Sequence, residues 1–275
     1  MTGIEMKRKL LLIGNPGIQG VNYTPSVNNV LKRYKEFFKS EVGGYWTDGE
    51  NGEIIEEPTG LDRNSEVTWL ALQLKELNKD IDYSVIVFVG HGGAYLGKDQ
   101  VQLSLGEILP LSCLMAPQGM EGIIKRTIIV DACRSLIGAT PSELILEEKT
   151  FSGEGQLMGD FCRDYYNTVI KNCEPHVELL QSTKYGEVAK INPTHTGTAF
   201  SDALFKTFDR NIPLWNAAAL NDRCGQLNKG IADILPEVQA GMKAYNQVPE
   251  YSRYGGKGDF PIYAVWRAVD RRISI

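Results

Sequence analysis

The chain has 275 residues, of which 43% are hydrophobic and 23% charged, and its formal net charge is -5. This composition is that of an ordinary globular protein with enough apolar material for a sizeable core. The acidic balance argues against nucleic acid as a partner, because a basic stripe is the expected footprint. No internal repeat or low-complexity linker divides the sequence, so a single domain over residues 1–275 is the economical interpretation.

The five cysteines include no CxxC pair, so neither a disulfide framework nor a structural zinc site is expected. The apolar core of the N-terminal segment, residues 10–13, is shorter than the roughly 7–15 residues of a signal peptide. No apolar stretch approaches the ~20 residues of a membrane span. The sequence therefore predicts a soluble, cytoplasmic protein without membrane contact.

In chain order, the first predicted element is a buried strand at residues 9–17, an apolar run closed by turn residues. The spacing of apolar residues predicts a helix at residues 25–40. Residues 42–62, rich in glycine and acids, predict an exposed excursion or a small hairpin. A second amphipathic helix is predicted at residues 65–79. Five consecutive apolar β-formers then predict a strand at residues 83–93 that is buried on both faces.

A second strand of this kind is predicted at residues 126–135, after a short helix near residues 105–113. Strands that alternate with helices of ten to fifteen residues predict an α/β fold with a mostly parallel central sheet and helices on both faces. Ligands in such folds bind at the carboxyl ends of the strands. The remaining predicted elements are a helix from about residue 158, a strand with a turn at 176–191, helices at 196–211 and 227–245, and a strand at 259–269.

Two of the buried strands end in a reactive side chain. The run "FVGHGG" ends in His91 between glycines, and "IIVDACRS" contains Cys133. A cysteine attacks as the thiolate, and a neighbouring imidazole acts as base or acid. Because acyl transfer also needs donors aimed at the oxyanion, the N–H groups of Gly92 and Cys133 are the candidates for an oxyanion hole. This pattern favours a cysteine nucleophile over an inert core thiol.

These two motifs resemble those of the caspase-like cysteine peptidases, the group of caspases, metacaspases and paracaspases. "LLLIGNPG" is similar to the first strand of that family, and residues 179–208 to its strand, turn and helix after the subunit linker. The resemblance covers most of the chain and implies a caspase-like three-layer αβα sandwich. It implies that Cys133 attacks a peptide carbonyl and that His91 protonates the leaving amine and then activates water.

The residues around the nucleophile depart from the animal caspases. Asp131 stands where the caspase signature has glutamine, and Ser135 where it has glycine, which places the chain nearer to the bacterial and metacaspase side. Ile191 stands where a second pocket arginine would be expected. Residues at i and i+2 of a strand share a face, so the Asp131 carboxylate and Cys133 can face one cavity, and a basic residue is the expected preference.

Glu187, after the turn at Gly186, is a candidate for a second negative charge, and Ser182 of the same segment is assigned to the substrate site. The alternatives are a structural carboxylate at Asp131 and a solvated turn residue at Glu187. Residues 139–173 lie where caspase-type zymogens are cut, and Lys149 is a candidate self-processing position. An ordinary surface loop is the alternative there. His195 is a minor candidate at the border of the cleft.

The sequence predicts no cofactor and no metal site; the acids of residues 53–62 lack the spacing of a calcium loop. The expected partner is a protein substrate. No sensor domain is recognisable, so a separate regulatory protein is expected, and family analogy suggests a role in cell death or antiviral defence. Two rival functions stay open: an inactive caspase-like interaction module, and a small-molecule amidase or thioester hydrolase with the same dyad.

Overall fold

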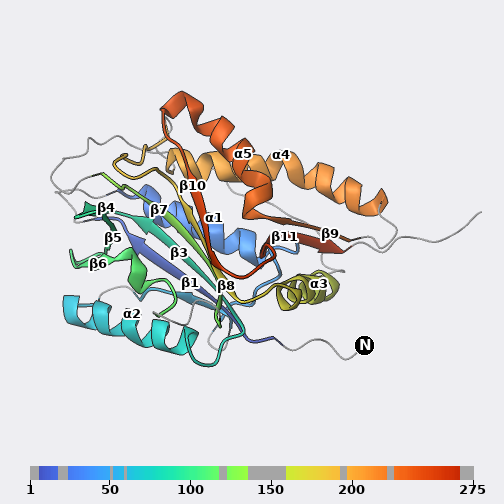
Figure 1. The fold of residues 1–275 in the computed structure, drawn as a ribbon, viewed down its shortest axis with the longest axis horizontal. Helices are drawn as coiled ribbons and strands as arrows, with labels where there is room; N and C mark the ends of the chain where they lie inside the picture. The colour runs from blue at the N-terminus through green and yellow to red at the C-terminus, as the bar shows by residue number, and fades with distance from the viewer. Residues whose placement is uncertain are drawn as a thin grey trace, which may run out of the picture.

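The computed structural model describes residues 6–17, 24–49, 52–58, 61–117, 123–135, 159–192, 197–221 and 226–266. At its centre is a six-stranded sheet with the strand order β10-β8-β7-β3-β1-β2 (Figure 1). All neighbours pair in parallel except β10, which is antiparallel to β8. The strands are β1 (Arg8–Asn15), β2 (Ile54–Glu56), β3 (Tyr83–Gly90), β7 (Lys125–Ala132), β8 (His176–Gln181) and β10 (Glu250–Gly255).

Helices cover both faces of this sheet, as the sequence predicts (Figure 1). Side chains of alternate parity along the strands form two separate apolar clusters. One cluster joins the sheet to α1 (Ser26–Lys39), α3 (Gly159–Asn172), α4 (Ala199–Asn221) and α5 (Ile231–Met242). The other joins it to α2 (Arg63–Leu77). The result is a three-layer αβα sandwich. None of the helices in the described ranges is long and apolar enough to cross a membrane.

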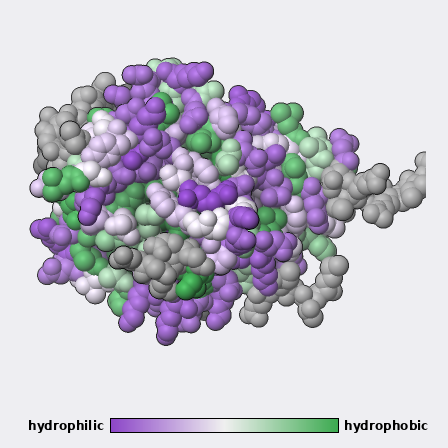
Figure 2. Space-filling view, viewed as in Figure 1, coloured by the Kyte–Doolittle hydropathy of each residue, from purple (hydrophilic) through white to green (hydrophobic). Residues whose placement is uncertain are grey.

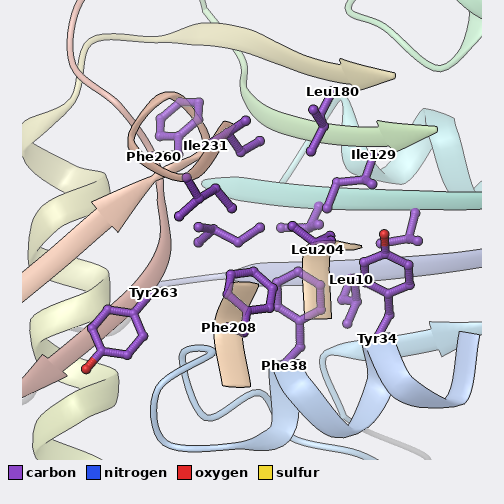
Figure 3. Packing of buried hydrophobic residues seen from close by; sticks show 14 of the residues in the cluster. Leu10, Tyr34, Phe38, Ile129, Leu180, Leu204, Phe208, Ile231, Phe260 and Tyr263 are labelled. Carbon is purple, nitrogen blue, oxygen red and sulfur yellow. The ribbon is translucent and has the colours of Figure 1, made fainter. Parts of the chain in front are cut away.

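Aromatic side chains fill the layer between the sheet and the larger group of helices. The Phe37 ring of α1 stacks on Phe208 of α4, with 4.3 Å between the ring centroids. Figure 3 shows Tyr34 and Phe38 reaching up from α1 into this layer, with the Tyr34 hydroxyl directed toward the sheet. The outer surface differs, because polar side chains cover most of the face in Figure 2 and apolar ones occur only in small groups.

Two small sheets extend the core. β4 (Gly92–Tyr95), β5 (Lys98–Gln102) and β6 (Ile108–Pro110) form an antiparallel sheet that begins two residues after β3 ends. A 3-10 turn, η1 (Leu111–Cys113), follows β6. The second sheet pairs β9 (Gln226–Gly230) with β11 (Pro261–Trp266), and a further 3-10 turn, η2 (Lys243–Tyr245), follows α5.

The structure corrects several sequence-based predictions. Residues 42–62 are not a simple exposed excursion, because they supply edge strand β2 and bury Trp46. The segment also contributes Glu53, whose Oε1 atom lies 2.9 Å from Nε of Arg8 on β1. The short helix predicted near residues 105–113 is strand β6 and one 3-10 turn. The final strand, β11, pairs with β9 and lies outside the central sheet. Residues 227–230, predicted as the start of a helix, belong to strand β9, and the helix begins at Ile231.

Candidate active site

The candidate catalytic residues follow two neighbouring parallel strands at the same edge of the sheet. In the register of β3 and β7, Val89 lies opposite Asp131, and Gly90 lies opposite Ala132. His91 and Cys133 are the next residues of the two strands. Neighbouring strands lie about 4.8 Å apart, so the fold places the backbone of His91 beside that of Cys133 although 42 positions separate them in the sequence.

A glycine allows the histidine segment to turn away from the sheet. Gly90 has φ +148°, and a side chain there would collide with the backbone of Asn15, since an added Cβ would lie 2.4 Å from the Asn15 oxygen. Asn15 in turn donates from Nδ2 to the Gln102 carbonyl at 2.6 Å. The end of β1 therefore holds both sides of the loop that carries His91.

The backbone N–H of Gly92 points toward the cysteine segment. His91 pairs with Gln102 at the start of the β4–β5 ladder, where the Gln102 N–H donates to the His91 carbonyl at 3.0 Å. Hydrogen-bonded and non-hydrogen-bonded pairs alternate in an antiparallel ladder, so the next pair, Gly92 with Val101, is not hydrogen-bonded and the Gly92 N–H points away from β5. Two residues on, the Ala94 N–H has the same orientation and donates to the Ser135 carbonyl at 2.8 Å. The N–H of Gly92 thus faces the segment of Cys133 and Ser135, as an oxyanion-hole donor must.

Gly92 also lies in tight contact with the nucleophile segment. A Cβ at this position would be 2.9 Å from both the Cys133 and the Gln100 carbonyl oxygens. Only a residue without a side chain fits between these two strands of chain. The second proposed donor, the Cys133 N–H, interacts with its own sulfur and lowers the pKa of the thiol, so it faces the same side as the nucleophile.

The Cys133 thiol is partly buried and protonated at rest. Burial raises the pKa of the Cys133 thiol, and the Asp131 carboxyl raises it further. The Ala189 N–H, 3.3 Å from the sulfur, and the Lys190 ammonium act in the opposite direction. Since burial outweighs them, the pKa of the thiol is raised, and a base is needed to form the thiolate.

Asp131 is buried at the end of β7, with 1% of its surface exposed. Its Oδ2 accepts a hydrogen bond from the Thr198 hydroxyl, and the Ser182 hydroxyl also contributes. Burial raises the pKa of Asp131 to about 7, although both hydroxyls lower it. Thr198 precedes α4, and its Oγ1 accepts from the Ser201 N–H at 2.9 Å, so the same side chain begins the helix and holds the carboxyl group.

The second carboxyl oxygen, Asp131 Oδ1, is buried and has no hydrogen-bond partner among the described residues. The hydroxyl of Tyr34, on α1, is buried without a partner in the same way. The two groups are neighbours, because the Asp131 charge contributes to raising the pKa of Tyr34, after burial itself. A buried oxygen without a donor costs about 1–3 kcal/mol, which an incoming donor would recover.

Ser182 and Glu187 differ from Asp131 in what their side chains contact. Ser182 is fully buried, and its one hydroxyl proton is shared between the Ala132 carbonyl, 3.2 Å away, and the Asp131 carboxyl group. The Glu187 Oε2 accepts from the backbone N–H groups of Lys184 at 3.2 Å and Val248 at 3.3 Å. Glu187 therefore closes the turn after β8, and Ser182 supports Asp131 and the strand end from beneath.

Arg134, the residue after the cysteine, is a further member of the site that sequence reasoning did not single out. Its Nε and Nη2 atoms each lie 2.9 Å from an oxygen of Asp99, on β5. Its Nη1 donates to the Thr183 carbonyl at 2.7 Å and to Glu250, on β10, at 2.6 Å. The guanidinium thus ties the segment of Cys133 to the hairpin that follows His91. A charged residue next to the cysteine in "ACRS" was the available signal.

Two candidate positions, Lys149 and His195, lie outside the described residues, as does most of the predicted linker. Its last part, from Gly159 to Asn172, is helix α3. The cysteines at positions 113, 133, 162 and 173 do not form disulfide bonds. Within the described ranges, no group of three or more histidine, cysteine or acidic side chains is arranged to hold a metal ion.

Comparison with known proteins identifies the family. The sequence profile of the caspase domain, peptidase C14, matches residues 7–259. The chain belongs to the caspase domain family. No curated protein sequence matches it. Among solved structures, that of caspase-1 from Spodoptera frugiperda is similar, with a TM-score of 0.51, 12% identity, and coverage of 91% of this chain and 89% of that one. At this identity, the likeness shows a caspase-like fold.

Membership of the caspase domain family makes this chain, in general terms, a member of a cysteine peptidase family. The matched range contains both strands whose ends carry His91 and Cys133, together with the Asp131 environment. The family assignment therefore covers every described residue of the candidate active site.

Proposed function

We propose that this chain is a cysteine endopeptidase in which Cys133 is the nucleophile and His91 the acid-base residue. The observation that carries the proposal is the β3–β7 register, in which both residues follow paired strand ends. The orientation of the Gly92 N–H toward the cysteine segment adds the expected oxyanion donor. A protein substrate in an extended conformation is the expected partner.

The reaction proceeds in two stages. His91 takes the proton of the Cys133 thiol as the sulfur attacks the peptide carbonyl, and the N–H groups of Gly92 and Cys133 stabilise the oxyanion. The imidazolium then gives the proton to the leaving amine, and a thioester remains on Cys133. In the second stage His91 removes a proton from water, which hydrolyses the thioester, and the proton returns to the sulfur.

The preference we propose is for a basic residue before the scissile bond. Asp131 supplies a buried carboxyl group on the same side of β7 as Cys133, with one oxygen that still lacks a donor. No arginine or lysine contributes to the pKa of Asp131, so no cation of the described residues neutralises it. An arginine or lysine side chain would supply both the charge and the missing donor. Glu187 does not supply a second charge in this proposal, because its carboxylate is committed to the turn.

A peptide library tests this proposal directly. Purified wild type and Cys133→Ala are incubated with the same library, and the cleavage positions are identified by mass spectrometry. The wild type is expected to cut after arginine or lysine, and the variant not to cut. Cleavage only after aspartate would refute the preference. Equal cleavage by both proteins would refute Cys133 as the nucleophile, and turnover of small amides without peptide cleavage would favour an amidase.

A further inference from the structure

A pair of glutamates lies at the edge of the sheet behind the histidine loop. The side chain of Glu57, which follows β2, forms a hydrogen bond with the side chain of Glu66 on α2. Glu66 is buried, with 2% of its surface exposed, and Glu57 is half-buried. Two carboxylates cannot hydrogen-bond to each other without a proton, so the contact requires one shared proton.

Both glutamates also accept backbone hydrogen bonds from the segments around them. The Glu57 Oε2 atom accepts from the Gly14 N–H at 3.2 Å. The two oxygens of Glu66 accept from Ser104 N–H at 2.7 Å and Leu105 N–H at 3.2 Å. The pair therefore joins the end of β1 to the turn that follows β5. The Ser104 hydroxyl completes this junction by donating to the Gly14 carbonyl at 2.8 Å.

This junction continues to the candidate catalytic histidine through two further contacts. Next to Gly14, the Asn15 side chain donates a hydrogen bond to the Gln102 carbonyl, and the Gln102 N–H donates to the His91 carbonyl. Every step of this path is a hydrogen bond to the backbone of the β5 end or of the histidine itself. Repulsion between the two glutamates would push Glu66 and the turn that it holds at Ser104 away from β1, and would loosen the strand to which His91 is hydrogen-bonded.

The shared proton resides on Glu57. Both oxygens of Glu66 face N–H groups, and Glu66 lies in the first turns of α2, where the helix dipole favours a negative charge. Burial and then the hydrogen bond with Glu66 raise the pKa of Glu57 to about 8, against the Gly14 N–H, which lowers it.

The other charged groups of the neighbouring segments are engaged elsewhere. Arg63, at the start of α2, pairs with Glu107. Asp62 caps the same helix by accepting from the Ser65 N–H at 2.8 Å. Glu56 pairs with Lys35. No cation contributes to the pKa of Glu57, so only a proton relieves the repulsion between the two carboxyl groups.

We propose that Glu57 and Glu66 are positioning residues that hold the histidine loop against β1 through one shared proton, and that loss of this proton loosens the loop. The effect on catalysis rests on the proposed peptidase function, whereas the effect on the loop does not. Deprotonation replaces a hydrogen bond by repulsion between two carboxylates, so the contact between Glu57 and Glu66 that joins β1 to the turn at Ser104 weakens as the pH passes about 8.

The sign of the effect on stability follows from linkage. The folded protein binds the Glu57 proton more tightly than the unfolded chain, whose glutamate has the usual pKa of 4.5. The stabilising contribution is therefore complete below about pH 4.5, declines as the pH rises, and is lost by about pH 8. Asp131 titrates near pH 7 as well, so the contribution of Glu57 must be isolated by comparing variants.

The test compares wild type with Glu57→Gln, whose amide can donate to Glu66 and accept from Gly14 at every pH. Melting temperatures are measured from pH 5 to 9, together with the hydrogen-exchange protection of residues 91–105. The melting temperature of wild type is expected to fall relative to that of Glu57→Gln as the pH rises to about 8. Above that pH, the difference between the two melting temperatures should stay constant. Protection of residues 91–105 is expected to fall about tenfold or more in wild type only, since a hydrogen bond to a charged group is worth about 1.5–3 kcal/mol.

Two further variants control this comparison. Glu56→Gln changes the neighbouring exposed glutamate and should behave as wild type at every pH. Glu66→Gln should lower protection at every pH, because the amide nitrogen that replaces one carboxylate oxygen donates and cannot accept from the Ser104 or the Leu105 N–H. If wild type and Glu57→Gln have parallel stability curves, or if protection of residues 91–105 does not change, the proposal is wrong. Peptidase activity is not needed for these readouts, so an inactive protein would overturn only the proposed function.

Discussion

Gly90 and Ala132 lie opposite each other at the ends of two neighbouring parallel strands. This single register position brings together the residues that follow them, His91 and Cys133. A shift of one residue in β7 would turn both the Cys133 thiol and the Asp131 carboxyl group to the other face of the sheet, and a shift in β3 would do the same to His91. The register is fixed by strands buried on both faces, so the core determines the geometry of the site.

Asp131→Asn is expected to lower kcat/KM for substrates with arginine or lysine before the scissile bond by about 10- to 100-fold. The reason is the loss of a charge-assisted hydrogen bond, worth about 1.5–3 kcal/mol. Cleavage kinetics on matched peptides with arginine and with norleucine measure the effect, which should be confined to the arginine peptide. An equal loss on both peptides would mean that Asp131 supports the fold and does not select the substrate.

The pH dependence of wild type should report the same carboxyl group. Burial raises the pKa of Asp131 to about 7, so the free protein binds cationic substrates better as the pH rises through 7 and the carboxylate forms. A profile of kcat/KM against pH should show this acidic limb, and Asp131→Asn should remove it. An unchanged limb in the variant would assign the titration to another group.

Gly92→Ala is expected to lower kcat by about 100-fold or more, because the added Cβ displaces the oxyanion donor from its place beside Cys133. KM and the near-ultraviolet circular dichroism spectrum separate a local effect from loss of folding. A variant with wild-type kcat would show that this N–H does not stabilise the transition state.

Arg134→Lys is expected to lower both stability and activity, although it keeps the positive charge. Lysine cannot form the bidentate contact with Asp99 while it also contacts Thr183 and Glu250. We expect a loss of about 1–3 kcal/mol in the free energy of unfolding, measured by urea denaturation. Glu250→Gln is the matched control with a smaller expected loss, because 41% of the Glu250 side chain is exposed.

Glu53→Gln tests the buried ion pair far from the site. Burial alone would raise the pKa of Glu53, but hydrogen bonds from Arg8 and Arg163 outweigh it and lower the pKa to about 2. The stabilising contribution is complete above about pH 4.5 and is lost as the pH falls through about 2. Denaturation at several pH values should therefore show a difference between wild type and variant that is largest near neutral pH and narrows in acid. A constant difference would contradict the pairing.

Much of the fold follows from local sequence patterns. The strands buried on both faces and the amphipathic helices were predictable, because each pattern is complete within ten to fifteen residues. The β4–β5 hairpin and strand β10 were not, since "GGAYLGKDQVQ" and residues 250–255 lack strong apolar alternation and are positioned by tertiary contacts. Trp46 is buried within a polar segment for the same reason: its partners, such as Arg8, are distant in the sequence.

In the candidate site, too, some features follow from local sequence patterns and others depend on tertiary packing. The position of His91, Cys133 and Asp131 at one edge of the sheet was predictable, because each is at or next to the end of a strand and strand ends of a parallel sheet meet at one edge. The roles of Thr198 and Tyr34 depend on where α4 and α1 pack against β7, which no local pattern states. The contacts of Glu187 were not predictable either, because its carboxylate binds Val248, which is 61 positions away.

Alkylation by an arginyl chloromethyl ketone tests most directly the proposal that Cys133, His91 and Asp131 act in one substrate site. Mass spectrometry of the treated protein should find one adduct, on Cys133, in wild type, with strong loss of labelling in His91→Ala and Asp131→Asn. Modification of a different cysteine would contradict Cys133 as the nucleophile. Equally fast labelling by an aspartyl chloromethyl ketone would contradict the preference for a basic residue.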